Sequence, residues 1–266
     1  MAEKFHHKIH RHVTQYGLIY GPLAIVLMAG LVWYGVHLTW GVSPQNAAPT
    51  PPDRAENTAV ATNAATQPDG LPDKILLNVP FTSQAPTGNW ADDRQQNACE
   101  ETSVLMATKW LKGESLGSAA NAEQEILAIS KMAEDMFGTY VDSSAADTLK
   151  LFRAYSGTQA GTLLYDVSIQ DMKHELAAGH LIIAPMNGQA LHNSNYTGAG
   201  PERHFLAIIG YDDKTGVFIT NDEGTRKGRD YPYKYETLYA AMRDYPTGDH
   251  QAITSNRRAM IVIAKP

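Results

Sequence analysis

The sequence predicts an α+β domain in which helices come first and strands follow to form a mainly antiparallel sheet. Apolar residues recur at helical spacing over much of residues 97–155, whereas from residue 162 onward they gather in short runs of strand length. The two patterns do not alternate steadily, which argues against a parallel sheet built from βαβ units. The domain is expected to cover residues 74–266, which is long enough to bury its own core.

The segment before this domain predicts a membrane anchor. Leu18–Trp40 is an uncharged apolar run, and as a helix it would span about 34 Å, enough to cross a bilayer core of roughly 30 Å. Residues 1–17 are basic and are expected to stay in the cytoplasm, which places the domain outside. A cleaved signal peptide with a secreted product is the alternative, but its apolar centre is normally only about 7–15 residues long.

Residues 41–73 predict a disordered tether. They are rich in Pro, Ala, Thr, Asn and Gln and have no periodic apolar face. The chain is therefore expected to consist of a cytoplasmic tail, a transmembrane helix at 18–40, a linker and one folded domain.

The first elements of the domain are a short strand and a helix that begins at Cys99. Ile75–Phe81 has strand character, and Pro80 places it at an edge or an end. Asn97 and Glu100 have the spacing of a capping box, and the helix should end at Gly113. The remaining expected helices are Ala119–Met136, Ser144–Tyr155, Ile169–Ala178 and Tyr235–Arg243, and the remaining expected strands are Thr162–Val167, Leu181–Met186, His204–Tyr211, Val217–Thr220 and Met260–Ala264.

Composition excludes several classes of function. The formal net charge is −6, so the chain lacks the basic excess that drives binding to nucleic acid. Cys99 is the single cysteine, which excludes an intramolecular disulfide and any site that needs several thiolates. No H-E-x-x-H motif occurs, and the domain histidines have no ligand spacing. No metal and no cofactor is expected.

Cys99 is the first candidate for chemistry. A cysteine attacks as its thiolate, and the unpaired N–H groups and dipole of a helix N-terminus favour that anion. The predicted position of Cys99 in the first turn of a helix therefore predicts a lowered pKa. The alternative is a small buried apolar residue, which is the usual role of a lone cysteine.

His204 is the candidate general base. It opens an apolar strand directly after a long polar loop, so its ring is expected at the mouth of the strand, where it could take the thiol proton. Asn221 or Asp222, at the end of the next strand, could orient the imidazole, and the alternation of a strand lets only one of them face it. The other histidines considered are His174, His180, His192 and His250.

Acyl transfer also needs donors for an oxyanion. The backbone N–H of Cys99 can supply one, and a side-chain amide of the preceding loop can supply another. Gln84, Gln95 and Gln96 are available, and Gln84 is favoured because it follows the first strand directly.

Four stretches, NVPFTSQAP, CEETSVLMATKWL, HFLAIIGYDD and ITNDEGTRKG, occur in this order. Together they resemble the bacteriocin-leader-peptidase-like, or double-glycine peptidase, family of the papain-like superfamily. The resemblance implies a papain-like fold with the cysteine helix packed on the sheet that carries the histidine. It also implies Cys99 as nucleophile, His204 as base, Asp222 rather than Asn221 as the orienting acid, and Gln84 as the oxyanion donor.

The chain departs from this family at two places. Glu223 stands where the family usually has proline after the acid, and the separation of Gln84 from Cys99 is longer than in the transporter-linked members. No nucleotide-binding G-x-x-x-x-G-K-[ST] loop occurs. We expect a free-standing, membrane-anchored cysteine peptidase that acts on a peptide or protein outside the cytoplasm. An inactive peptide-binding module on a tether and a cell-wall endopeptidase or amidase with the same thiol site are the alternatives.

Overall fold

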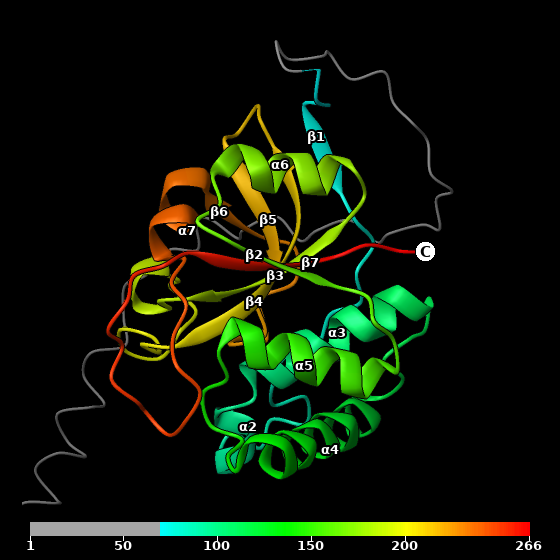
Figure 1. Cartoon of the computed structure of the whole chain (residues 1–266), viewed down its shortest axis with the longest axis vertical. Coiled ribbons are helices and arrows are strands. Elements are labelled where there is room, and N and C mark those ends of the chain that lie inside the picture. Colours follow the sequence, from blue (N-terminus) through cyan, green and yellow to red (C-terminus); the bar gives the residue numbers. More distant parts are fainter. Residues whose placement is uncertain (1–69) are drawn as a thin grey trace, which may run out of the picture. The chain divides into compact units, whose positions relative to one another are not determined.

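A computed structural model describes residues 70–266 (Figure 1). Its centre is an antiparallel sheet with the strand order β2-β7-β3-β4-β5-β6, and β1 also pairs with β4. The strands are β1 (Lys74–Leu76), β2 (Thr162–Tyr165), β3 (Leu181–Met186), β4 (His204–Asp212), β5 (Val217–Asn221), β6 (Tyr231–Lys234) and β7 (Ala259–Ile263). Every pairing is antiparallel, so the predicted α+β class with an antiparallel sheet is confirmed.

Helices cover both faces of this sheet. On one side lie α2 (Asp93–Gln96), α3 (Cys99–Lys112), α4 (Ala119–Phe137) and α5 (Ala145–Ser156), and on the other lie α6 (Ile169–Ala177) and α7 (Tyr235–Ala241), as Figure 1 shows. A short 3-10 turn, η1 (Gln189–Leu191), follows β3. The helices that come first in the sequence therefore form one layer, and the site is built where this layer meets the sheet.

The central strands divide their side chains between two cores. Phe205, Ala207 and Ile209 of β4 belong to the core that contains α3, whereas Leu206 and Ile208 belong to the core on the other face. Because both faces are buried, these strands read as continuous apolar runs instead of alternating ones. This packing fixes α3 against β4 and so sets the position of Cys99 relative to His204 at the start of that strand.

The expected elements have the right type and order, with boundaries that differ by a few residues. The first strand is the largest exception: it ends at Leu76 rather than Phe81. The chain beyond leaves the sheet and runs past β5, where the carbonyl of Val79 accepts a hydrogen bond from Asn221 Nδ2 at 3.2 Å. Pro80 lacks the N–H that a continuing strand would need. The sequence analysis missed α2, η1 and the edge strand β6.

The predicted capping box at the start of α3 is wrong. The N-cap is Ala98, which has no side-chain hydrogen bond to the helix. Asn97 instead ends α2 and donates its Nδ2 to the Asp93 carbonyl at 2.9 Å. The short helix α2 lies directly before α3, and Asn97 caps its C-terminus instead of the N-terminus of α3. The first turn of α3 consequently has no capping side chain over its N–H groups.

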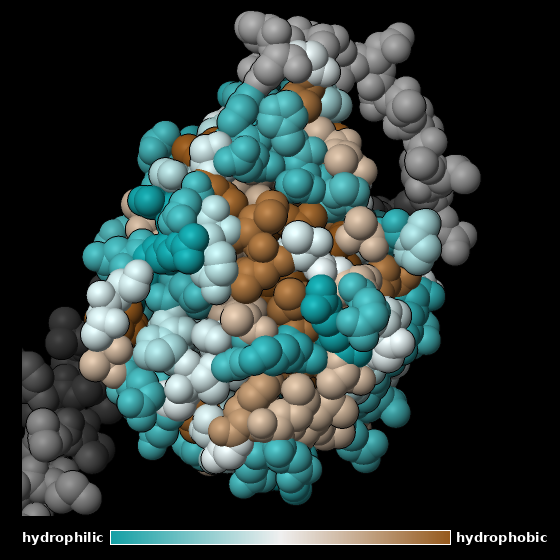
Figure 2. Space-filling model, in the orientation of Figure 1, coloured by the Kyte–Doolittle hydropathy of each residue, from teal (hydrophilic) through white to brown (hydrophobic). Residues whose placement is uncertain are grey.

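The predicted transmembrane helix at 18–40 and most of the linker at 41–73 lie outside the described residues. Within residues 70–266, no helix combines the length and hydropathy needed to span a bilayer. Figure 2 shows where hydrophobic residues reach the surface of the domain on the face seen in Figure 1: they gather near its middle and are bordered by hydrophilic ones.

Candidate active site

Cys99 is the first residue of α3 and lies at the wall of a groove. Its side chain is only 8% exposed, but it lines two adjoining cavities of about 410 and 510 Å³. The first of them is also lined by His204, Gln84 and Gln96. The structure thus brings the predicted nucleophile, base and two of the three candidate glutamines to one cavity.

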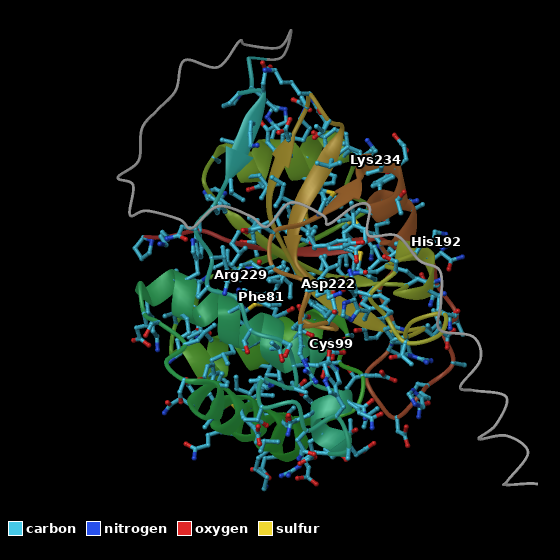
Figure 3. All side chains as sticks on the ribbon, turned by 180° about the vertical axis from the view of Figure 1, so that it is seen from behind. Phe81, Cys99, His192, Asp222, Arg229 and Lys234 are labelled. Atoms are coloured by element: carbon cyan, nitrogen blue, oxygen red, sulfur yellow. The ribbon has the colours of Figure 1, made fainter. Side chains whose placement is uncertain are left out.

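His204 and Asp222 form a buried pair beside Cys99. His204 is the first residue of β4, Asp222 follows β5 directly, and His204 Nε2 lies 3.0 Å from Asp222 Oδ1. Asn221 points away from the histidine, to the carbonyl of Val79. In the view of Figure 3, Asp222 and Cys99 lie near the middle of the molecule and His192 lies nearer its edge. An Nε2–H donated to Asp222 leaves Nδ1 as the basic nitrogen of the ring.

Asp222 receives more hydrogen bonds than its bond to His204 alone. Its Oδ2 accepts from the hydroxyls of Tyr233 at 2.5 Å and Tyr196 at 2.6 Å and from Asn193 Nδ2 at 3.0 Å. The N–H of Gly224 donates to Oδ1 at 3.1 Å. Burial on its own would raise the pKa of Asp222, but the charge of His204 and these donors outweigh it and lower the pKa.

Tyr196 also positions the histidine ring. It packs edge-on against His204 with ring centroids 5.6 Å apart and an interplanar angle of 77°. It belongs to the loop between η1 and β4 and lines the same cavity as Cys99. Burial and the neighbouring Asp222 charge raise the pKa of Tyr196 and Tyr233, so both remain protonated donors. The sequence analysis missed both tyrosines.

The expected lowering of the Cys99 pKa is wrong. Burial raises the pKa of the thiol well above its ordinary value, and the charge of Glu100 adds to the rise. The Cys99 thiol donates to Glu100 Oε2 at 3.0 Å. Two effects together outweigh the lowering of the pKa by the helix dipole. They are the loss of water around the sulfur anion and the negative charge of a carboxylate at this distance. The raised pKa favours the neutral form of the Cys99 thiol, which donates a hydrogen bond to the neighbouring carboxyl group.

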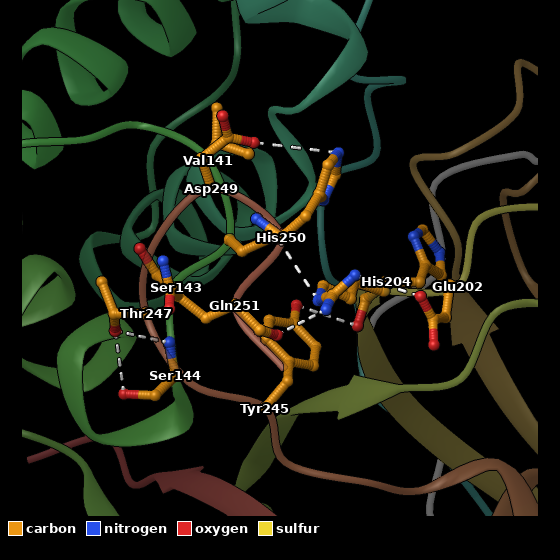
Figure 4. A network of polar contacts seen from close by, with 12 residues as sticks. Val141, Ser143, Ser144, Glu202, His204, Tyr245, Thr247, Asp249, His250 and Gln251 are labelled. Atoms are coloured by element: carbon orange, nitrogen blue, oxygen red, sulfur yellow. Dashed lines mark hydrogen bonds and ion pairs between the residues drawn. The ribbon is translucent and has the colours of Figure 1, made fainter. Parts of the chain in front are cut away.

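Glu100 also connects α3 to residues that lie far from it in the sequence. Its Oε1 accepts from the Ser143 N–H at 2.9 Å and from the Tyr245 hydroxyl at 2.8 Å. The same hydroxyl lies 3.2 Å from the carbonyl oxygen of His204 (Figure 4). Tyr245 thus contacts both the first turn of α3 and the start of β4. This arrangement fixes the relative position of nucleophile and base. The sequence analysis gave Glu100 only a capping role, and nothing in the local pattern pointed to Tyr245.

Two further carboxyl groups are buried near the start of α3. Glu101 has no hydrogen-bond partner for either side-chain oxygen among the described residues. Glu223 accepts from Ser103 Oγ at 2.9 Å with Oε1, while its Oε2 has no partner in residues 70–266. Burial raises the pKa of both groups well above the ordinary value. A neighbouring carboxylate raises each pKa further: Glu100 acts on Glu101, and Asp222 acts on Glu223. Glu223 thus places an acidic side chain against α3 at the position where proline was expected.

Two of the three candidate oxyanion donors are engaged with the backbone, whereas the side-chain amide of Gln95 has no hydrogen-bond partner within residues 70–266. Gln84 Nε2 donates to the carbonyls of Gln95 at 2.9 Å and Gln96 at 2.7 Å. Gln96 Nε2 donates to the Trp90 carbonyl at 2.6 Å, and Gln95 is fully buried. Gln84 is the best placed of the three because its own N–H is fixed to the Glu223 carbonyl at 3.0 Å and its side chain lines the cavity. It could meet an oxyanion only by giving up one of these carbonyls.

The other histidines lie elsewhere or have other partners. His180 is paired with Glu175 at 2.7 Å, and His174 and His192 are exposed. His250 is paired with Asp142 at 3.0 Å and lines the second cavity beside Cys99. Within residues 70–266 no group of three His, Cys, Asp or Glu side chains is arranged to hold a metal ion.

A family model covers this site. The model of the Peptidase_C39 like family matches residues 76–247, which include all four quoted stretches. The chain belongs to the Peptidase_C39 like family. This C39-like chain is accordingly a cysteine-type peptidase, as the resemblance implies.

Two solved structures are similar to this C39-like peptidase. One is a putative C39-like peptidase from Bacillus anthracis, with 14% identity and a TM-score of 0.40 over 72% of this chain and 98% of the other. The second is Xylellain, a cysteine protease from Xylella fastidiosa, with 14% identity and a TM-score of 0.48 over 80% of this chain and 95% of the other. No curated protein matches the sequence.

Proposed function

We propose that this protein hydrolyses peptide bonds outside the cytoplasmic membrane through a Cys99–His204–Asp222 triad and an acyl-enzyme. The observation that carries the proposal is the His204–Asp222 pair, 3.0 Å apart, in the cavity wall that also contains Cys99. A histidine oriented through one nitrogen presents the other as a base.

The reaction begins as the Cys99 thiol gives its proton to His204 Nδ1 while the sulfur forms a bond to the scissile carbonyl carbon. The oxyanion meets the N–H of Cys99 and the amide of Gln84. His204 returns the proton to the leaving amine as the C–N bond breaks, which leaves a thioester. Water, deprotonated by His204, opens the thioester to a carboxylic acid and restores the thiol. Asp222 stabilises the imidazolium form of His204 in both halves of the cycle.

The raised pKa of the thiol sets the order of events. Because burial and Glu100 disfavour the thiolate, proton transfer to His204 occurs together with attack rather than before the substrate binds. We expect kcat/KM to be bell-shaped in pH, since His204 must be unprotonated at the start and the Cys99 thiol must still carry the proton that it transfers. A flat profile through neutral pH would argue against the pair.

The decisive experiment incubates the full-length protein with a mixed peptide library that includes secreted and bacterial cell-wall peptides. We expect thiol-dependent cleavage, and we expect Cys99→Ala to remove it by at least about 10³-fold. Equal cleavage by wild type and Cys99→Ala would overturn the nucleophile. Peptide binding without cleavage would favour an inactive binding module, and cleavage confined to cell-wall peptides would favour a wall endopeptidase or amidase.

Anchoring in the membrane by Leu18–Trp40 is part of the proposal and is supported by the length and hydropathy of that segment. The full-length chain expressed in bacteria should sediment with membranes at high pH and high salt. Deletion of residues 18–40 should release it. Sedimentation of the deletion variant with membranes, or a processed N-terminus in the wild type, would contradict the anchor.

A further inference from the structure

A third cavity, of about 450 Å³, continues the groove beyond His204. It shares Trp90, Thr197 and Gly224 with the cavity that contains Cys99 and His204. The rest of its wall contains two cations, Arg226 and Lys227. The full lining is Trp90, Ser194, Asn195, Thr197, Gly224, Thr225, Arg226 and Lys227, and no carboxylate is among these residues.

Within residues 70–266 the two cations have no ion-pair partner. Among residues 70–266 most arginines and several lysines are engaged: Arg203 is paired with Asp142, and Arg229 lies over the Phe81 ring at 5.3 Å (Figure 3). Neither Arg226 nor Lys227 is paired with an acidic side chain in this part of the chain. Two exposed cations in a cavity whose lining has no carboxylate give it a positive potential, which favours an anion there.

The loop that carries these cations is fixed to the His204–Asp222 pair. It is closed at its base by the Asp222 N–H, which donates to the Gly228 carbonyl at 2.9 Å. A Cβ on Gly228 would lie 1.7 Å from the Asp222 carbonyl oxygen, so only glycine allows this closure. The loop therefore holds Arg226 and Lys227 four and five residues after the acid at a set distance from the site.

The proposed role of His204 indicates which side of the scissile bond faces the two cations. His204 protonates the leaving amine, so the peptide beyond the scissile bond extends past its ring. Gly224 packs against that ring, since a Cβ on it would lie 3.0 Å from His204 Cε1. Arg226 reaches from there to the loop after β1, where Nη2 lies 3.3 Å from the position of a Cβ on Gly88. The cations thus border the path of the leaving fragment.

We propose that the cavity bounded by Trp90, Arg226 and Lys227 is a carboxylate-binding subsite that selects an acidic group on the leaving side of the scissile bond. The assignment to the leaving side of the scissile bond rests on the proposed peptidase function. The carboxylate is either an Asp or Glu side chain or the free C-terminus of a short leaving fragment. An arginine and a lysine suit both, because each donates charge-assisted hydrogen bonds to carboxylate oxygens.

The test uses the full-length protein and a synthetic peptide library with Glu, Gln, Lys or Ala at each randomised position, in free-acid and C-terminal amide forms. Cleavage products are sequenced by mass spectrometry. We expect about tenfold enrichment of Glu over Gln on the leaving side at low salt, and a smaller enrichment at 0.5 M salt because exposed charges are screened. Enrichment confined to free-acid peptides would assign the subsite to the terminal carboxylate.

Arg226→Gln and Lys227→Gln should each reduce the Glu over Gln enrichment at least threefold. Lys214→Gln, an exposed lysine in the turn between β4 and β5 that lines no part of the groove, is the matched control and should leave the enrichment unchanged. The salt dependence in the wild type provides a readout that does not depend on the folding of a variant. Equal cleavage of Glu and Gln peptides by the wild type at low salt would overturn the subsite and leave the peptidase intact.

A binding arm separates the two proposals. Immobilised Cys99→Ala protein is exposed to the same library, and the retained peptides are sequenced. The subsite is supported if Cys99→Ala retains peptides enriched in Glu and the double variant Cys99→Ala, Arg226→Gln does not. This holds even if the wild type cleaves no peptide, an outcome that would refute the peptidase proposal alone. Retention without charge preference overturns the subsite.

Discussion

The pKa values of buried carboxyl groups are shifted in opposite directions on the two walls of the groove. On the sheet side, Asp222 is fully buried but is given hydrogen bonds by His204, Tyr196, Tyr233 and Asn193, and its pKa is lowered. On the helix side, Glu100 accepts hydrogen bonds from Cys99, Ser143 and Tyr245, whereas Glu101 has no partner among residues 70–266, and the pKa values of both are raised. The pKa of Glu223, which follows Asp222 in the chain and accepts from Ser103 of α3, is raised as well. Burial raises the pKa on both walls, and the charge of His204 together with its donors is what lowers the pKa of Asp222.

This difference bears on the chemistry. An ionised Asp222 stabilises a charged His204, whereas a thiol beside Glu100 resists ionisation. The shifts of the two groups are therefore opposite: the pKa of the Cys99 thiol is raised and that of Asp222 is lowered. Variants that change the donors or the carboxyls on one wall should therefore have different signatures from those on the other.

Removal of the acid on the sheet side should have the largest effect. Asp222→Ala leaves His204 without its partner and leaves several buried donors unsatisfied, so we expect kcat/KM to fall by about 10³-fold. Peptide cleavage under subsaturating substrate measures this. Asp230→Ala, an exposed acid of the same hairpin, is the control. Activity within threefold of wild type in Asp222→Ala would show that the histidine is oriented without it.

The next effect concerns the thiol. Glu100→Gln removes the neighbouring negative charge, so the pKa of Cys99 should fall and alkylation by iodoacetamide at pH 7 should become about tenfold faster, the change expected for one pKa unit. Cys99 is the single cysteine, so the reaction reports on it alone. Glu134→Gln, exposed on α4, should alkylate like the wild type. An unchanged or slower rate in Glu100→Gln would refute the role of its charge.

A smaller effect should separate the donors of Asp222 from simple packing. Tyr233→Phe removes the hydroxyl 2.5 Å from Asp222 Oδ2, so the pKa of Asp222 should rise and the acidic limb of kcat/KM should move to higher pH. We expect about a threefold loss at pH 5 and a smaller loss at pH 7, by analogy with one neutral hydrogen bond. Tyr231→Phe, whose ring packs on Tyr233, is the control. A loss equal at both pH values would indicate packing alone.

The smallest effect is on stability. The pKa of Glu101 is raised in the folded state, so its contribution to stability is greatest below its unfolded value of about 4.3 and is lost as pH rises through the folded value. Glu101→Met removes this unpartnered carboxyl and should raise Tm at pH 8 by about 2–4 °C, with a smaller rise at pH 4.5. Thermal unfolding followed by circular dichroism measures this.

Glu236→Met, exposed on α7, should leave the pH dependence of Tm unchanged. The same experiment has the opposite sign on the sheet side, where the pKa of Asp222 is lowered. Its contribution to stability is present above its unfolded value of about 3.9 and is lost as pH falls through the folded value. A Glu101→Met variant that is less stable than wild type at pH 8 would contradict the assigned protonation.

The sequence by itself determined the order and type of most elements and singled out His204, with Asn221 or Asp222 as its partner. Apolar periodicity, the glycine after α3 and the polar loop before β4 are local signals, and local signals specify local structure. Strand alternation left Asn221 and Asp222 equivalent until the pairing of β4 and β5 turned one of them toward His204.

Only the tertiary structure decided the electrostatics of the site. The helix position of Cys99 favoured a low pKa, but burial and Glu100 reversed it. Tyr245 lies 145 residues from Glu100 in the sequence, yet its hydroxyl contacts that carboxylate and the backbone of His204. Desolvation and contacts between distant residues depend on how the two layers pack, and no local pattern in the chain encodes them.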